Sequence, residues 1–456
     1  MSRERGLAQR HLVPHFTGAA AWLAPDLPIF ERGEGCYLWD SDGNRHLDGL
    51  AGLFCVNIGH GRADLSAVAA KQMEALAYST NWGFAHPASI EAAALIAEVA
   101  PGDLSEVFFV SSGSEAVESA LKFARNYHVA RGEDSRYKVI SRNWSYHGTT
   151  LGALAVTAIP KFRDPYLPML WDGVRHVPNT RQCTSPAGTP AGELTCVSAI
   201  EEMILAEGPE TVSMVIAEPV QNGGGALVPP DGYWGELRRI CDLYGVLLCA
   251  DEVICSFGRF GHWFASERFG VVPDMITFAK GVTSAYQPLG GLLIRGPLVE
   301  EIFESPGGSF VHGSTFGGHP VATAVAVANI IAMRDEGLLE HVLATEGYFR
   351  ERLQGVADAH TCIGEVRGTG FFYAVDLCAD SGTGLDLSPG QESALRGGVL
   401  GGFVRDARVT IRPDDRGYTG LSISPPLVAD AEVIDDLVGR VDQIAGRVDQ
   451  WLAENH

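Results

Sequence analysis

Short apolar runs alternate with longer stretches of helical periodicity through the middle of the chain. The pattern predicts helices at 90–100 and 115–130, and strands at 107–110, 138–141, 214–217 and 246–250. The predicted strands are continuous apolar runs rather than in-out alternations, as expected where helices cover both faces of a sheet. We therefore predict an α/β fold around a central, mostly parallel sheet.

Three segments outside this alternation show other patterns. Residues 35–48 predict a hairpin of two short strands around Asp42-Gly43. The segment 178–193 is rich in Thr, Pro, Gly and Ala, and we expect a surface insertion. The alanine-rich stretch 320–334 predicts a long buried helix that links two domains.

Beyond that helix, a second α/β unit is indicated by predicted strands at 364–376, 409–412 and 421–424. At 456 residues the chain is too long for one small core, which favours one large domain with a smaller one beside it. We expect an N-terminal segment at 1–55, a large domain at 56–325 and a C-terminal small domain at 326–456.

Composition and charge narrow the function classes. Lys and Arg number 34 against 56 acids, a formal net charge of −22, which disfavours binding to nucleic acid or anionic membranes. The nine cysteines show no CxxC pair and no metal-type spacing, so we expect reduced thiols, no metal site and a cytoplasmic location. No run of about 20 apolar residues suggests a membrane span.

Lys280 and Asp251 each follow an apolar run, and together they indicate chemistry with an aldehyde cofactor. Pyridoxal phosphate would hold the lysine as a Schiff base, while a carboxylate keeps its pyridine nitrogen protonated. An isolated lysine or aspartate is more often only a solvated surface group. The pair therefore needs support from other motifs.

A phosphate seat is predicted where the strand 107–110 runs into Ser111-Ser112-Gly113-Ser114 at the start of a helix. Free backbone amides and the positive end of the helix dipole favour an anion there, and Gly113 permits a close approach. Simple capping of the helix by a serine is the alternative interpretation.

Further candidates follow neighbouring strands at the same edge of the sheet. Tyr146, in Trp144-Ser145-Tyr146-His147-Gly148, lies where ligands of open α/β folds gather and could stack on a ring. Glu218 begins the glycine-rich stretch 218–225 after another strand and could orient a ligand. A core role for Tyr146 and a structural role for His147 are the alternatives.

Taken in order, the motifs SGSEA, SYHG, EPVQ, ADEV, AKG and HGSTFGGHP resemble the class III aminotransferases of the fold-type I pyridoxal phosphate enzymes. The resemblance covers nearly the whole chain, and residues 49–60 resemble the N-terminal signature of the ω-transaminase, or amine:pyruvate, branch. It implies a seven-stranded central sheet in the large domain, with a small domain built from both ends of the chain.

The resemblance also implies site roles. Lys280 would be the Schiff-base lysine and proton shuttle, Asp251 the partner of the pyridinium nitrogen, and Tyr146 the stacking ring. The other expected cofactor contacts are Ser112, Gly113, Ser114, His147, Glu218 and Val253. Thr315 is expected to reach the cofactor phosphate of a neighbouring subunit, so a homodimer is implied.

Substrate selection is inferred from the same resemblance. Phe16, Phe54, Trp82 and Phe84 resemble positions of an apolar donor pocket, although a core role for some is equally plausible. Arg412 resembles the mobile arginine that binds an acceptor carboxylate, and Arg416 is the alternative. Relatives that use 2-oxoglutarate commonly carry an acid at the position of Gly223, so a keto acid such as pyruvate is favoured.

The sequence therefore predicts a transaminase that moves an amino group from a primary amine or ω-amino acid to a keto acid, through aldimine and ketimine forms in a ping-pong cycle. A 2-oxoglutarate-dependent enzyme acting on 4-aminobutyrate, a diamine or a biosynthetic substrate is an alternative. A decarboxylase or aminomutase of the same fold would share Lys280 and Asp251. A cofactor-binding regulator would need a basic DNA-binding extension, which the sequence lacks.

Overall fold

A seven-stranded sheet forms the centre of the larger part of the molecule in the computed structural model, which describes residues 3–186 and 188–455. Its strand order is β4-β10-β9-β8-β7-β5-β6. The bounds are β4 Leu104–Val110, β5 Lys138–Arg142, β6 Val174–Val177, β7 Val212–Ala217, β8 Leu247–Asp251, β9 Met275–Phe278 and β10 Gly290–Arg295. Only β10 runs antiparallel to its neighbours, which confirms the mostly parallel sheet.

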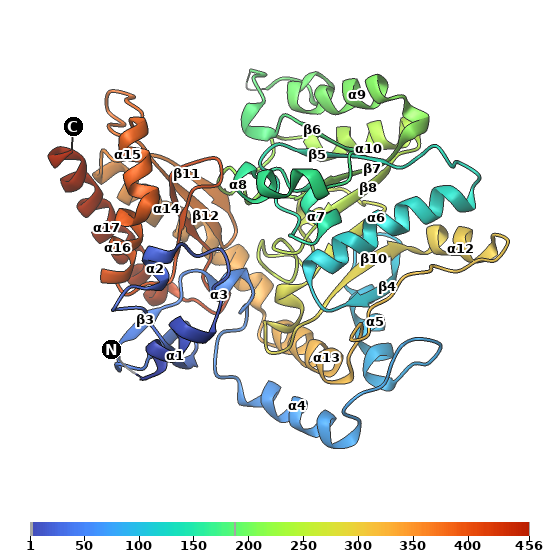
Figure 1. Cartoon of the computed structure of the whole chain (residues 1–456), viewed down its shortest axis with the longest axis horizontal. Coiled ribbons are helices and arrows are strands. Elements are labelled where there is room, and N and C mark those ends of the chain that lie inside the picture. Colours follow the sequence, from blue (N-terminus) through green and yellow to red (C-terminus); the bar gives the residue numbers. More distant parts are fainter. Residues whose placement is uncertain (1–2, 187, 456) are drawn as a thin grey trace.

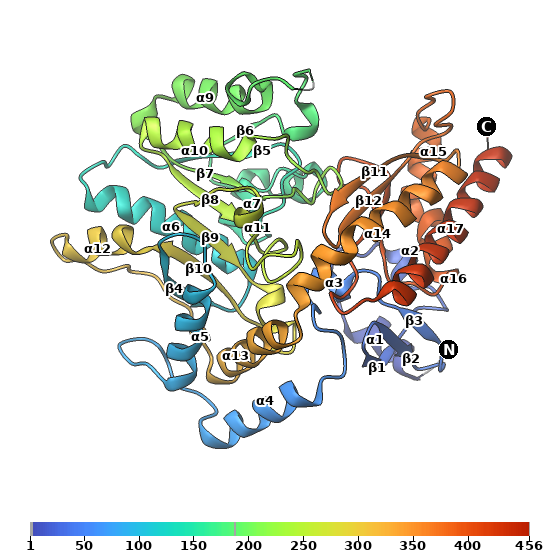
Figure 2. The same cartoon turned by 180° about the vertical axis from the view of Figure 1, so that it is seen from behind.

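Helices cover both faces of this sheet (Figures 1 and 2). In β7, Met214 and Ile216 pack with α6 (Gly113–Ala130), α7 (Leu151–Val156) and α12 (Gly296–Glu304). Val215 and Ala217 point to the other face, which carries α5 (Pro87–Glu98), α9 (Thr195–Glu207), α10 (Tyr233–Tyr244) and α13 (Pro320–Asp335). Burial on both sides explains why these strands are apolar throughout.

The smaller part combines both ends of the chain, as Figure 1 shows by the blue and red segments lying together. The N-terminal sheet contains β1 (Phe30–Glu34), β2 (Tyr37–Asp40) and β3 (Arg45–Leu47). The predicted hairpin is β2–β3, whereas β1 was not expected. The amide of Leu47 donates to Arg408 O at 3.0 Å, and Thr410 N donates to Leu47 O at 2.8 Å, which joins the two ends.

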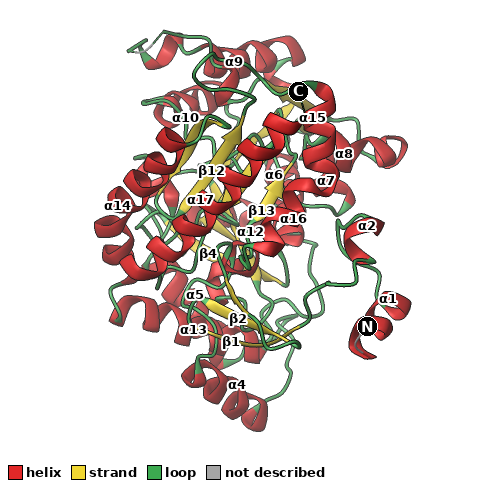
Figure 3. Cartoon of the chain, turned by 90° about the vertical axis from the view of Figure 1, so that its left-hand side faces the viewer, coloured by secondary structure: helices red, strands yellow, loops and turns green. Residues whose placement is uncertain are grey.

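The C-terminal sheet has four antiparallel strands in the order β11-β12-β14-β13. Helices α14 (Leu338–Ala359) and α17 (Ala431–Glu454) lie on its outer side, which faces the viewer in Figure 3. The strand expected at 364–376 is a hairpin of β11 (Ile363–Thr369) and β12 (Phe372–Leu377), because Gly370, with φ of 56°, turns the chain. The strand expected at 409–412 begins only at Arg412 (β13, Arg412–Asp414), and β14 is Gly420–Ile423.

The remaining helices and 3-10 turns complete the chain. The α-helices are α1 Arg3–His11, α2 Ala19–Trp22, α3 Ala51–Phe54, α4 Ala63–Ala75, α8 Pro160–Arg163, α11 Ala265–Arg268, α15 Pro389–Ala394 and α16 Leu400–Asp406. The turns are η1 Asp164–Met169, η2 Thr180–Gln182, η3 Ala191–Glu193, η4 Pro209–Thr211, η5 Lys280–Thr283 and the π-helical η6 Leu395–Val399. The long helix expected at 320–334 is α13, which runs through the boundary expected at residue 325. We propose that the chain passes into the small domain at Gly337, which separates α13 from α14 with φ of 63°.

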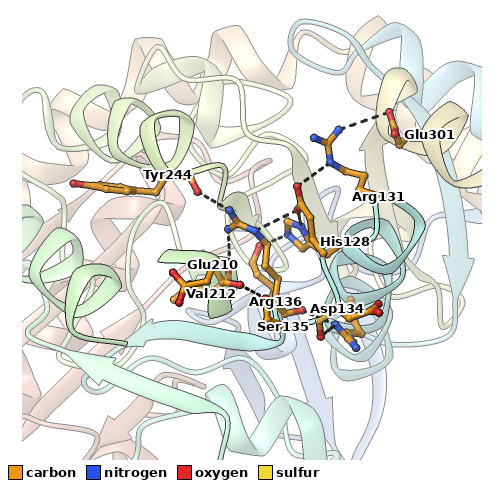
Figure 4. Close-up of polar contacts among 12 residues, drawn as sticks. His128, Arg131, Asp134, Ser135, Arg136, Glu210, Val212, Tyr244 and Glu301 are labelled. Carbon is orange, nitrogen blue, oxygen red and sulfur yellow. Dashed lines mark hydrogen bonds and ion pairs between the residues drawn. The ribbon is translucent and has the colours of Figure 1, made fainter. Parts of the chain in front are cut away.

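Arg136 links segments at the amino-terminal ends of the sheet strands by hydrogen bonds (Figure 4). Its Nη1 donates to Pro209 O and Val212 O, both at 2.9 Å, and its Nη2 donates to Tyr244 O at 3.0 Å. Three backbone acceptors from two separate segments are thereby satisfied by one guanidinium group. This cluster lies at the end of the strands opposite to the candidate site.

Candidate active site

A cavity of about 160 Å³ lies at the carboxyl ends of β4, β5, β7, β8 and β9. Side chains that follow these strands converge on it, which is where open α/β sheets bind ligands. The cavity is lined by Ser112, Gly113, Ser114, Tyr146, His147, Gly148, Glu218, Asp251, Val253, Ile254, Cys255, Ala279 and Lys280. The fold thus brings together every predicted cofactor-binding residue except Thr315.

Asp251 is held rigidly at the floor of this cavity. Its Oδ2 lies 2.6 Å from His147 Nδ1, and its Oδ1 accepts hydrogen bonds from Thr277 Oγ1 at 3.0 Å and Val253 N at 3.2 Å. Asp251 and His147 are both buried. His147 therefore orients a buried carboxylate, and among the described residues its own Nε2 has no hydrogen-bond partner.

Lys280 enters the cavity from a strained backbone. Its φ is 47°, in the left-handed region that a residue other than glycine rarely adopts, at the start of η5. From α13, Asn329 Nδ2 donates to Gly281 O at 2.9 Å and Val282 O at 3.1 Å, which fixes the turn that follows the lysine. Burial lowers the pKa of Lys280, although nearby negative groups, including Asp251 and Glu218, oppose this effect.

The strand-to-helix junction forms a cradle with little room for side chains. Ser112 caps α6, its Oγ accepting from Glu115 N at 3.3 Å, so the capping interpretation holds for this residue. A Cβ on Gly113 would lie 2.8 Å from Val253 Cγ1, and one on Gly148 would overlap Ser114. Ser114 Oγ also accepts from Thr149 N at 3.2 Å. Glycine at both positions lets the start of α6 approach Val253 and lets the segment after Tyr146 approach Ser114.

Tyr146 and Glu218 form another wall. Glu218 Oε1 accepts from Tyr146 N at 3.0 Å, and its Oε2 accepts from Asn222 N at 2.9 Å. Burial raises the pKa of Glu218. The Tyr146 ring contacts Phe162 at 6.0 Å between centroids, and Phe16 packs on Phe162 at 4.7 Å. Tyr146 thus borders an aromatic cluster formed by Phe162 and Phe16.

The two candidate arginines, Arg412 and Arg416, have different neighbours. Arg412 is bound by Asp414, which accepts from its Nε at 3.0 Å, and by Asn222 Oδ1 at 2.9 Å. Arg416 lies with its Cζ 5.6 Å from the Tyr146 ring centroid and 5.1 Å from that of Phe162. Its Nε is 4.0 Å from Asp414, the carboxylate already engaged by Arg412. Two guanidinium groups therefore share one buried carboxylate.

The backbone around Gly223 admits no side chain. A Cβ built on Gly223 would overlap the carbonyl oxygen of Trp144. The backbone of Trp144 is itself in the left-handed region, with φ of 63°. The adjoining amide of Gly224 donates to Arg416 O at 2.6 Å, so the loop that carries Arg416 rests on this glycine segment. An acidic residue at position 223 would require a different backbone.

None of the five predicted substrate contacts lines the cavity, and Thr315 does not line it either. Phe54 is 2% exposed and packs in the core against Phe372, with Arg412 Cζ 5.2 Å from its ring centroid. Trp82 and Phe84 line a separate apolar cavity of about 1270 Å³ and are 63% and 72% exposed. Thr315 is exposed, and its carbonyl accepts from Tyr78 Oη at 2.7 Å.

Sequence reasoning missed two positioning residues. Asn329 stands out as a polar residue in an otherwise alanine-rich buried helix, which was the available signal. Arg259 is fully buried, and burial lowers its pKa to about 10. Its Nη2 donates to Asn57 Oδ1 at 2.6 Å and its Nη1 to Pro425 O at 2.5 Å, which ties three distant segments beside Lys280. Nothing in the local sequence signals that role.

Residues 20–444 match the family model of the class III aminotransferases. The chain belongs to this family. Class III aminotransferases are pyridoxal phosphate enzymes, and the resemblance seen in the sequence motifs is confirmed. The α/β fold expected from the resemblance is also that of the ω-transaminases with known structures.

This class III aminotransferase is 43% identical to a probable aminotransferase of Mycobacterium tuberculosis over 94% of its own length and 91% of the relative. It is 38% identical to the putrescine–pyruvate aminotransferase of Pseudomonas aeruginosa, over 95% and 94%. The ω-transaminase of Pseudomonas jessenii in complex with PMP superposes with a TM-score of 0.92 at 32% identity, covering 100% of both chains.

None of the helices within residues 3–186 and 188–455 is both long enough and apolar enough to pass through a membrane. In the same residues, no group of three or more His, Cys, Asp or Glu side chains could hold a metal ion.

Proposed function

We propose that the protein is a pyridoxal phosphate-dependent transaminase of the amine:pyruvate type, which moves an amino group from a primary amine or ω-amino acid to a keto acid such as pyruvate. The observation that carries this proposal is the convergence of Lys280, the Asp251–His147 pair and the glycine cradle on one cavity. The fit is specific, because a lysine amine, a buried carboxylate held by His147 and the start of α6 all line one cavity of about 160 Å³.

Different residues around the cavity would hold different parts of the cofactor. Gly113 and Ser114 would hold the phosphate, Asp251 the pyridine nitrogen, and Tyr146 and Val253 the two faces of the ring. When bound, pyridoxal phosphate supplies an electron sink that makes the proton next to the donor nitrogen acidic. Lys280 provides the attachment point.

Lys280 also moves the proton. Its amine is neutral more often than that of a solvated lysine because burial lowers its pKa, so it can accept the proton at Nζ and return it to another carbon. Asn329 keeps the turn behind Lys280 in place. His147 lies 2.6 Å from Asp251 and keeps the carboxylate aligned.

We propose Arg416, rather than Arg412, as the group that binds the carboxylate of the keto acid. Arg412 is bound by Asp414 and Asn222, whereas Arg416 borders Tyr146 and lies 4.0 Å from Asp414, the carboxylate that Arg412 already binds. Asp415, the neighbouring acid, pairs with Lys161 at 2.5 Å. A substrate carboxylate would therefore give Arg416 a partner that it does not have to share with Arg412.

The backbone at Gly223 supports pyruvate over 2-oxoglutarate as acceptor, because an acid that could regulate the arginine has no room there. A 2-oxoglutarate-dependent enzyme remains the alternative, and a decarboxylase or aminomutase is a more distant one. We further propose a homodimer with Thr315 at the partner's cofactor phosphate, and we keep the cytoplasmic location as a prediction.

Spectroscopy on the purified holoenzyme tests this function. Putrescine, a primary amine without a carboxylate, should remove the visible absorbance band of the cofactor, and pyruvate should restore it while alanine appears. Lys280→Ala should abolish the exchange. A band restored by 2-oxoglutarate and not by pyruvate would favour the alternative acceptor, and release of carbon dioxide from an amino acid would favour a decarboxylase.

A further inference from the structure

Two cysteines in the insertion at 178–193 and the helix after it lie together, away from the candidate active site. Cys183 follows η2 and is half-buried, and Cys196 is the second residue of α9 and is 1% exposed. Thr195 Oγ1 donates to Cys183 Sγ at 3.7 Å. The Cys183 thiol donates in turn to Ser185 Oγ at 3.7 Å. The sulfur of Cys183 thus lies at the first turn of α9, beside Cys196.

The loop between the two cysteines is already closed by its own hydrogen bonds. Thr184 N donates to Thr195 Oγ1 at 3.0 Å, and Thr195 N donates to Ser185 Oγ at 2.9 Å. Ser185 Oγ donates to Glu193 O at 3.3 Å. Bringing the two cysteines together therefore costs the native chain little further ordering.

The surroundings of Cys183 favour its thiolate. Although burial opposes the effect, hydrogen bonds with the side chain and backbone of Cys196, and with Ser185 and Thr195, lower the pKa of Cys183 to about 7. Burial raises the pKa of Cys196 to about 12. One partner is thus ready to attack as a thiolate while the other remains a protonated thiol.

The other cysteines provide a contrast. Cys55 is also half-buried, but burial raises its pKa. Cys241 is buried and has its pKa raised to about 12. A reactive thiol is therefore specific to the pair at 183 and 196, and it does not follow from exposure alone.

We propose that Cys183 and Cys196 are a redox modification site, which forms a reversible disulfide when the protein meets a small-molecule disulfide such as oxidised glutathione. The Cys183 thiolate attacks one sulfur of glutathione disulfide, forms a mixed disulfide and releases one glutathione thiolate. Cys196 then loses its proton and attacks Cys183 Sγ, which releases the second glutathione. The small disulfide is reduced to two thiols as the protein dithiol is oxidised.

The disulfide would fasten a segment that contacts both parts of the molecule. Arg181 Nη2 lies 2.7 Å from Asp376 Oδ2 in β12, and Asn179 Nδ2 donates to Asn143 O at 3.0 Å near the active-site edge. Cross-linking Cys183 to α9 would restrict this segment. Slower hydrogen exchange of the amides between the two cysteines is the expected consequence.

Peptide mapping of the full-length holoenzyme tests the proposal. The protein is incubated with glutathione buffers of rising oxidised fraction, alkylated, denatured and cleaved after glutamate, which separates Cys183 from Cys196 at Glu193. The two fragments should stay joined in the oxidised sample and separate on reduction. In the reduced enzyme at pH 7.5, Cys183 should be alkylated about threefold faster than Cys55, the internal control.

Single cysteine variants test whether the disulfide joins Cys183 to Cys196. Cys183→Ser and Cys196→Ser should each prevent joining of the fragments, and Cys196→Ser should leave glutathione attached to Cys183. Cys241→Ser is the matched control and should behave as wild type. Fragments that separate without reduction at every glutathione ratio, or a disulfide that joins other cysteines, would overturn the proposal even if a variant failed to fold.

Discussion

At the scale of single residues, the charge of Asp251 carries the proposed chemistry, and its neighbours hold it in place. Asp251→Asn keeps the shape but loses the charge that faces the cofactor ring, so kcat/KM should fall by about 10²-fold to 10³-fold. Thr277→Val removes one hydrogen bond from an uncharged donor to the same carboxylate and should cost about tenfold or less. Steady-state kinetics compare the two. Equal losses would show that Asp251 acts through its shape and not its charge.

The two arginines offer a second test at this scale. Arg416→Ala should raise KM for pyruvate about tenfold or more and leave KM for the amine donor nearly unchanged, because only the acceptor carries a carboxylate. Arg412→Ala leaves Asp414 buried without its main partner, so it should lower the free energy of unfolding by about 3 kcal/mol. Urea unfolding and kinetics separate these effects. A selective acceptor defect in Arg412→Ala would restore the assignment made from the sequence.

At the scale of elements, Arg136 joins the start of β7 to the end of α10 through backbone carbonyls (Figure 4). Arg136→Ala leaves three acceptors without this donor and should reduce the free energy of unfolding by about 2 to 4 kcal/mol. The control is Arg131→Ala in the same cluster, whose partners Glu133 and Glu301 are on the surface and whose loss should cost below about 1 kcal/mol. Equal effects in chemical denaturation would contradict the role of Arg136.

Another contact between elements should depend on pH. His360, at the end of α14, binds Asp449 Oδ2 at 2.7 Å and Asp442 Oδ1 at 3.0 Å on α17. Although burial lowers it, these carboxylates raise the pKa of His360 above its usual value. Its contribution is therefore fully present below the unfolded pKa, about 6.5, and is lost as pH rises through the folded pKa. Wild type should exceed His360→Gln in urea midpoint at pH 5.5, and the two should converge at pH 8.5.

At the scale of the whole molecule, Trp82 and Phe84 form an exposed apolar surface of the kind that binds other proteins. We propose that a second copy of the chain covers it. Sedimentation equilibrium should give twice the 48.8 kDa chain mass. Trp82→Asp should shift the enzyme toward monomer and weaken cofactor binding, because Thr315 lies on the same side. Leu243→Asp, at a 59% exposed position on α10, is the control. A monomeric wild type with full activity would contradict the dimer.

The sequence by itself predicted the alternation of helices with four strands of the central sheet, and it singled out Lys280, Asp251 and Gly113 as candidates. Those features depend on local periodicity, and on residue types that follow the ends of neighbouring strands. Only the tertiary structure paired His147 with Asp251, 104 positions away, and placed Asn329 behind Lys280. It also brought Arg416 to Tyr146 while engaging Arg412 with Asp414, and it turned one expected strand into the β11–β12 hairpin. These outcomes depend on burial and charge balance between distant segments, which the local pattern along a chain does not encode.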